Sequence, residues 1–224
     1  HYDHWFGLAG VDNAVSWGHR SLLDDLNSGI TPEWAEELGF TRDKVLAPTH
    51  LVESVSRIDL GDRTVEVCWC GPGHTDGDLV VLVPDADVIF AGDLLETEEP
   101  SFGPDATIGT WPGVLDRLLE RSGPNTIIVT GHGRLMTRDD AAAQRSAIQR
   151  LFDMGSRLFR QGVTLQDALD SQTSLDHGRE QPFSTEAVQA ALVLIYAEVA
   201  NRISRTRRSQ RNSLAASSED DSPQ

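Results

Sequence analysis

Four short segments rich in His, Asp and Gly place the strongest constraint on this chain, because each lies beside a predicted strand end or in a Gly-rich turn. They are His1–Gly7 (HYDHWFG), Gly71–Gly77 (GPGHTDG), Ala91–Asp93 (AGD) and Thr130–Gly133 (TGHG). Side chains at strand ends are held on a rigid frame, and neighbouring glycines let the backbone turn sharply beside them. The pattern therefore predicts a scaffold of strands that presents imidazoles and carboxylates from its ends.

Runs of β-branched and apolar residues predict the scaffold itself. The expected strands are Thr64–Cys70, Leu79–Pro84, Asp87–Phe90 and Thr126–Thr130, with a hairpin turn at Pro84–Asp87. Helical patterns are expected at Pro32–Leu38, at Trp111–Arg121, from Thr137 to about Arg160, and after Ser184, where Val188, Leu192, Ile195 and Val199 form an apolar stripe. Strands alternating with helices predict an α/β fold.

Composition narrows the classes of partner. The formal net charge is −16, which disfavours binding to a phosphate backbone, so we expect a small-molecule substrate and no nucleic acid. No apolar run approaches the ~20 residues that a membrane span needs. Cys68 and Cys70 are too close in sequence for an unstrained disulfide, so we expect free thiols and a cytoplasmic location. The oligomeric state is left open.

Imidazoles and carboxylates together are the ligand set for zinc and similar divalent ions. His1, His4, His74 and His132 all lie in the four segments, and Asp93 follows a strand. Each has a plainer interpretation when taken alone, since a His after Gly caps turns and an Asp after a strand caps helices. Four such segments in one chain favour a metal site.

The order and the amino-acid sequences of the four segments resemble the motifs of the metallo-β-lactamase superfamily. That family carries His-x-His-x-Asp-His, then a His in a Gly-His-Thr turn, then an Asp or Cys after a strand, then a final His. His1-Tyr2-Asp3-His4 matches the last four positions of the first motif, and His74, Asp93 and His132 match the rest. The resemblance runs from His1 to about Met136. It implies an αββα sandwich whose N-terminal strands, and whose leading His two residues before His1, are missing from this chain.

Carried over residue by residue, the resemblance implies two metal ions, expected to be zinc, with iron or manganese as alternatives. His1 and His74 would bind the first ion, Asp3, His4 and His132 the second, and Asp93 both. Two such ions would share a hydroxide that attacks the substrate. Asp3 is the expected catalytic residue, because its place in the motif lets it hold the hydroxide and take up a proton.

The expected function is a dinuclear, zinc-dependent hydrolase of a small ester, thioester, lactone or amide. One alternative is a thioesterase similar to hydroxyacylglutathione hydrolase, and another is a non-catalytic binding module of the same fold. We expect residues 1–203 to form the metallo-β-lactamase-like domain, with a helical extension from about residue 138. Residues 204–224, rich in Arg, Ser and Asp, are expected to be a disordered polar tail.

Several neighbouring residues are given ordinary roles. His19, His50 and His177 lack flanking ligands, and Glu96, Glu98 and Glu99 form an acidic run that we expect to be solvated. The aromatic residues Tyr2, Trp5 and Phe6 are equally consistent with packing and with lining a pocket. The Gly- and Pro-rich segment Glu99–Trp111 is a candidate substrate-facing loop.

Overall fold

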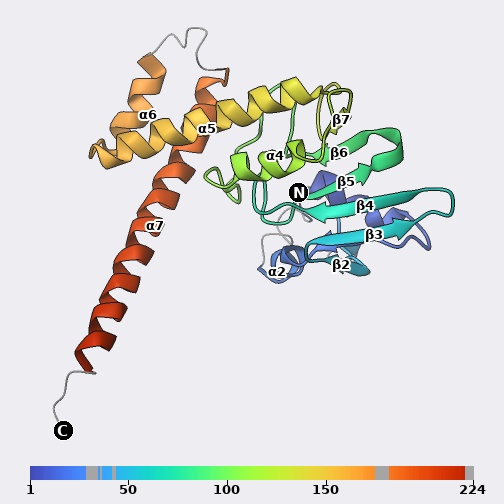
Figure 1. Ribbon diagram of the computed structural model, residues 1–224, viewed down its shortest axis with the longest axis horizontal. Coiled ribbons are helices and arrows are strands. Elements are labelled where there is room, and N and C mark those ends of the chain that lie inside the picture. Colours follow the sequence, from blue (N-terminus) through green and yellow to red (C-terminus); the bar gives the residue numbers. More distant parts are fainter. Residues whose placement is uncertain (29–34, 36, 42–43, 175–181, 220–224) are drawn as a thin grey trace.

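The computed structural model describes residues 1–28, 35, 37–41, 44–174 and 182–219, and it shows an α/β fold (Figure 1). Its main element is a five-stranded sheet of order β3-β4-β5-β6-β7. The strands are β3 (Val55–Asp59), β4 (Thr64–Trp69), β5 (Leu79–Val83), β6 (Val88–Gly92) and β7 (Ile127–Thr130). Neighbouring strands are antiparallel from β3 to β6, whereas β6 and β7 are parallel.

The four strands expected from the sequence are confirmed as β4 to β7, with bounds that differ by one or two residues. The expected hairpin is also confirmed: β5 and β6 pair through Val83↔Val88 around a short 3-10 turn, Pro84–Ala86. Asp87 closes this turn in the left-handed region, at φ 52°. Aspartate tolerates that conformation better than most side chains, which explains the turn at this position.

Three strands were not expected. β1 (Trp17–His19) and β2 (His50–Val52) form a two-stranded parallel sheet, and β3 is an edge strand of the main sheet. β1 and β2 have three residues each and pair across more than 30 positions of sequence, so no local pattern marks them. The remaining N-terminal elements are also short: α1 (Tyr2–Trp5), a 3-10 turn at Phe6–Gly10, and α2 (Ser21–Ser28).

Helices α4 (Trp111–Leu119) and α5 (Arg138–Arg160) cover one face of the main sheet (Figure 1). The sheet contributes alternate residues to the shared core, among them Val80, Ile89 and Ile128, each at most 2% exposed. Helix α5 begins where the sequence predicts it, because Thr137 and Asp140 form a reciprocal capping box. This packing fixes the strand ends that carry the His and Asp residues.

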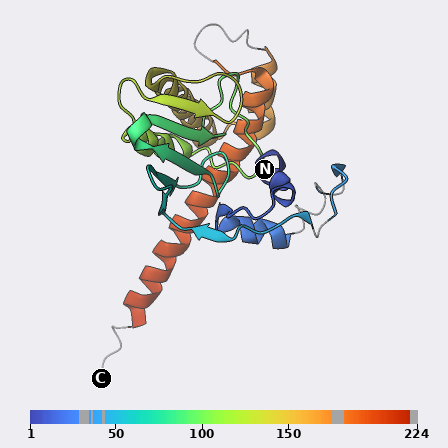
Figure 2. The same cartoon turned by 90° about the vertical axis from the view of Figure 1, so that its right-hand side faces the viewer.

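The last two helices are α6 (Leu165–Ser174) and α7 (Thr185–Glu219), and α7 projects well beyond the rest of the molecule (Figure 2). The predicted stripe on α7 is confirmed, since Val188, Leu192, Ile195 and Val199 are all buried. No helix in the described part of the chain is both long and apolar enough to cross a membrane.

The segment expected to be a disordered polar tail begins inside α7. Residues 204–219 continue α7, although residues 201–210 are all exposed. A helix that is already formed adds one hydrogen bond for each further residue, so a helix anchored by its buried stripe can continue into residues whose side chains are exposed. Residues 220–224 lie outside the described residues. So does most of the helix expected at Pro32–Leu38.

Candidate metal centre

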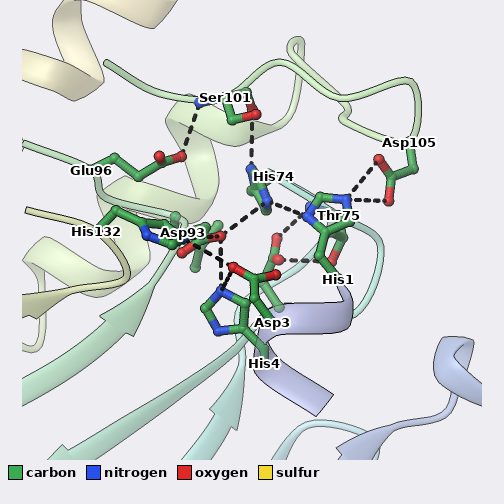
Figure 3. Close-up of polar contacts among 12 residues, drawn as sticks. His1, Asp3, His4, His74, Thr75, Asp93, Glu96, Ser101, Asp105 and His132 are labelled. Atoms are coloured by element: carbon green, nitrogen blue, oxygen red, sulfur yellow. Dashed lines mark hydrogen bonds and ion pairs between the residues drawn. The ribbon is translucent and has the colours of Figure 1, made fainter. Parts of the chain in front are cut away.

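The four predicted segments meet at one end of the main sheet, where their His and Asp side chains point toward one another (Figure 3). α1 and its N-cap supply the first segment, and the loop after β4 supplies the second. Asp93 directly follows β6, and His132 lies two residues after β7. The parallel pairing of β6 with β7 places these last two residues at the same sheet edge.

Asp93 is the centre of this cluster. Its Oδ2 oxygen lies 3.0 Å from Nε2 of His4 and 3.5 Å from Nε2 of both His74 and His132. The His74 Nε2 nitrogen is in turn 2.9 Å from Nδ1 of His1. A single carboxylate is therefore within reach of imidazoles from three separate segments.

The ligand atoms fall into two groups that share Asp93. One group contains Asp3, His4, Asp93 and His132, and the other contains His1, His74 and Asp93, with the atoms of each group within 4.8 Å of one another. Asp3 completes the first group through its Oδ2 oxygen, 3.2 Å from Nε2 of His132. This division matches the two ligand sets that the sequence resemblance implies.

The Oδ1 oxygen of Asp93 is buried and has no hydrogen-bond partner among the described residues. A buried carboxylate oxygen without a partner is costly, and a cation is the partner that suits it. Burial raises the pKa of Asp93, but the hydrogen bond from His4 and the nearby imidazoles outweigh burial and hold the pKa below its usual value. The residues present thus fit a divalent cation bound at Asp93.

His74 is held in one tautomer. Its Nδ1–H donates to the Ser101 carbonyl at 3.1 Å, so Nε2 presents the lone pair that faces His1 and Asp93. Ser101 is fixed by Glu96, whose Oε1 accepts from its backbone N–H at 2.9 Å. Burial lowers the pKa of His74, which favours the neutral imidazole that a metal requires.

The prediction for Glu96 is wrong. It was expected to be solvated, but its side chain is buried, at 9% exposed. Glu98 is exposed, as expected, and Glu99 was also expected to be solvated. Glu99 instead accepts hydrogen bonds from the backbone and hydroxyl of Ser184, at the start of α7.

His1 is oriented by a carboxylate that the sequence analysis did not single out. Nε2 of His1 lies 3.3 Å from Oδ1 of Asp105, while its Nδ1 faces His74. The hydrogen bond to Asp105 raises the pKa of His1 above its usual value. Asp105 lies in the segment Glu99–Trp111, which was expected to face the substrate, so the composition of that loop was the available signal.

A cleft of about 580 Å³ opens beside the ligand cluster. Pro104 and Asp105 line it, which confirms that part of the loop Glu99–Trp111 faces this space. Trp5 lines it as well, whereas Phe6 packs in a small separate core with Ala35 and Val45.

The three histidines given ordinary roles differ in outcome. His19 lies in the wall of the cleft and stacks on Trp69 at 4.5 Å between ring centroids. His50 is exposed and stacks on Trp17. His177 lies outside the described residues. Both cysteines are free thiols, as expected.

Comparison with known proteins agrees with this geometry. The family model described as "Metallo-beta-lactamase superfamily" matches residues 1–151. The chain is 27% identical over 115 residues to metallo-beta-lactamase type 2 of Bacillus cereus, covering 50% of this chain and 43% of the relative. It is 29% identical over 112 residues to the protein of the same name from Pseudomonas aeruginosa, covering 49% of this chain and 46% of the relative. The chain thus spans about half the length of the curated relatives it matches.

A solved structure with the same fold is the stereoselective inverting sec-alkylsulfatase Pisa1 from Pseudomonas sp. It aligns with a TM-score of 0.56 and 18% identity over 69% of this chain and 27% of that chain. Since the family model covers well over half of the residues, the chain belongs to the metallo-β-lactamase superfamily. The predicted α/β fold of that type is confirmed.

Proposed function

We propose that this protein is a dinuclear metal-dependent hydrolase of small esters, thioesters, lactones or amides, with zinc as its metal. The observation that carries the proposal is the pair of ligand groups that share Asp93, whose side chain is only 8% exposed. His1, His74 and Asp93 would hold one ion, and Asp3, His4, Asp93 and His132 the other. Imidazole and carboxylate together suit zinc, with iron or manganese as further candidates.

Bound in this centre, the ions supply Lewis acidity, which lowers the pKa of water and polarises a carbonyl oxygen. The protein contributes a fixed and partly buried arrangement of ligands. His74 is held by Ser101 and His1 by Asp105, so neither ring needs to reorient when a substrate enters. Both rings belong to the buried side of the cluster.

Asp3 is the proposed general base. It is exposed, and its Oδ2 atom lies 3.2 Å from His132 and 3.5 Å from His4. Both contacts are with members of its own ligand group, so the carboxylate lies beside the ion that this group would hold. In that position Asp3 can accept the proton of an attacking water and pass it to the leaving group.

The first test is hydrolysis of a small panel: an aryl ester, an acyl thioester and a γ-lactone, assayed with zinc and with excess chelator. We expect turnover of at least one substrate with zinc and its loss with chelator. His132→Ala should abolish the reaction, because His132 contributes to the second ligand group. Turnover that persists in chelator or in His132→Ala would contradict the proposal.

A further inference from the structure

The cleft beside the ligand cluster has many apolar lining residues. They are Trp5, Leu8, Val11, Trp17, Leu22, Pro48, Leu79, Ala91 and Pro104. They come from α1 and the 3-10 turn after it, from β1, α2, β5 and β6, and from the loops around these elements. Trp17 is stacked on His50 with 4.6 Å between ring centroids, which keeps this wall in place.

The charged lining residues are all of one sign. No Lys or Arg is found among the described residues that line the cleft. The charged lining residues are Asp3, Asp25, Asp78, Asp93 and Asp105. Arg20 follows the lining residue His19, but it pairs with Glu53 and is not part of the wall.

The remaining imidazole adds no positive charge. Burial lowers the pKa of His19, so its ring is neutral near neutral pH. Burial, followed by the negative charges of nearby aspartates, Asp105 foremost, raises the pKa of Asp25. The other histidines that line the cleft belong to the two ligand groups.

We propose that the substrate of this centre is an uncharged ester or lactone whose apolar part lies against Trp17 and Leu22, and that the cleft excludes molecules with a carboxylate at that end. The proposal rests on the hydrolase function argued above and names its substrate class. A carboxylate held against Trp17 and Leu22 would lose water, and no Lys or Arg among the described lining residues would pair with it. Asp25, one helical turn after Leu22 on α2, carries a like charge. An apolar group would gain the burial of its surface.

Two hydroxamates test this directly, because a hydroxamate head binds a metal centre without being hydrolysed. Hexanohydroxamic acid and the monohydroxamate of adipic acid differ only in whether the far end is a methyl group or a carboxylate. Titration calorimetry with the zinc-loaded protein gives both dissociation constants. We expect the methyl ligand to bind at least tenfold more tightly than the carboxylate ligand.

A charge added to the wall supplies the matched variant. Val11 lines the cleft and is 58% exposed, so Val11→Lys adds a cation without disturbing the core. Val15→Lys places the same charge at a residue that is 62% exposed and outside the lining, so it serves as the control. Val11→Lys should reduce the preference for the methyl ligand to less than threefold, and Val15→Lys should leave it unchanged.

The outcomes separate the two proposals. Equal affinities, tighter binding of the carboxylate ligand, or a preference that Val11→Lys does not change would each overturn the substrate class. The hydrolase proposal would survive those results as long as binding requires zinc. If neither hydroxamate binds the zinc-loaded protein, the cleft holds no accessible metal centre, and both proposals fall.

Discussion

A Cβ atom added to Gly131 would lie 1.6 Å from the Oδ1 oxygen of Asp93. The backbone after β7 thus passes directly over the carboxylate that both ligand groups share, and only glycine leaves room for it. Gly133, two residues on, has φ +94°, and a Cβ atom added there would lie 1.9 Å from the Oγ1 oxygen of Thr97. The glycines on either side of His132 are therefore required by the position of Asp93 and Thr97.

Gly131→Ala tests this relationship. The new methyl group must displace Asp93 or the β7 loop, so we expect the zinc affinity to fall at least tenfold, measured by competition with a chromophoric chelator. Gly113→Ala is the control, because its Cβ would meet nothing closer than 4.0 Å and alanine favours the helix α4. Equal zinc affinities in the two variants would show that Gly131 does not constrain the site.

Asp105→Asn tests the orientation of His1. Asparagine keeps the shape of the side chain but loses the charge that fixes the His1 ring, and the loss of such outer partners typically lowers metal affinity about 10–100-fold. We expect a decrease in that range by zinc titration calorimetry. Asp76→Asn, at an exposed position of the loop that carries His74, should bind zinc as the unmodified protein does. An unchanged affinity in Asp105→Asn would remove Asp105 from the site.

Glu198→Ala tests how helix α7 supports the loop that carries Ser101 and Asp105. Glu198 accepts hydrogen bonds from the backbone N–H groups of Ile108, at 2.7 Å, and Gly109, at 3.0 Å. Its removal leaves two partly buried donors without their acceptor, so we expect the free energy of unfolding to fall by about 2–3 kcal/mol in urea.

Arg205→Ala, at an exposed position of the same helix, is the control for Glu198→Ala. It also removes a long charged side chain, but it should change the free energy of unfolding by less than about 0.5 kcal/mol. If both variants have the same small effect, Glu198 does not hold the loop.

Asp78 makes stability depend on pH. It accepts hydrogen bonds from the backbone and hydroxyl of Thr75, yet burial raises its pKa from 3.8 to about 6. Between those pH values the folded state binds more protons than the unfolded state, so this residue makes the protein less stable as pH rises. The lost stability remains lost above the folded pKa.

Asp78→Asn removes this dependence. Relative to the unmodified protein, its free energy of unfolding in chelator should increase by up to about 3 kcal/mol between about pH 4 and pH 7, since one pKa unit corresponds to about 1.4 kcal/mol. Asp62→Asn, at an exposed turn, should show no such trend. A stability difference between Asp78→Asn and the unmodified protein that does not vary with pH would refute the assignment.

His74, Asp93 and His132 have a local signal, because each lies beside Gly shortly after an apolar run, whereas Asp3 was singled out only through the family resemblance. The partners that orient the ligands could not be predicted. Asp105 is 104 positions from His1, and Glu96 lies in an acidic run that resembles a solvated surface. Their roles depend on how the loop Glu99–Trp111 folds back over the sheet, which no local pattern encodes.

The strands show the same division. β4 to β7 are buried on one face and carry strong apolar patterns, whereas β3 alternates exposed and half-buried residues along its whole length. As an edge strand in which Ser56, Arg57 and Asp59 are polar, it is hard to distinguish from a loop.

Metal content tests the central claim most directly. Elemental analysis of the protein after zinc loading and desalting should find about two zinc ions per chain, as two ligand groups that share a carboxylate require. His74→Ala should lose at least one of them, while His50→Ala, which alters a histidine outside both groups, should retain both. A well-folded sample that binds no metal, or a His74→Ala variant that keeps its full content, would contradict the account.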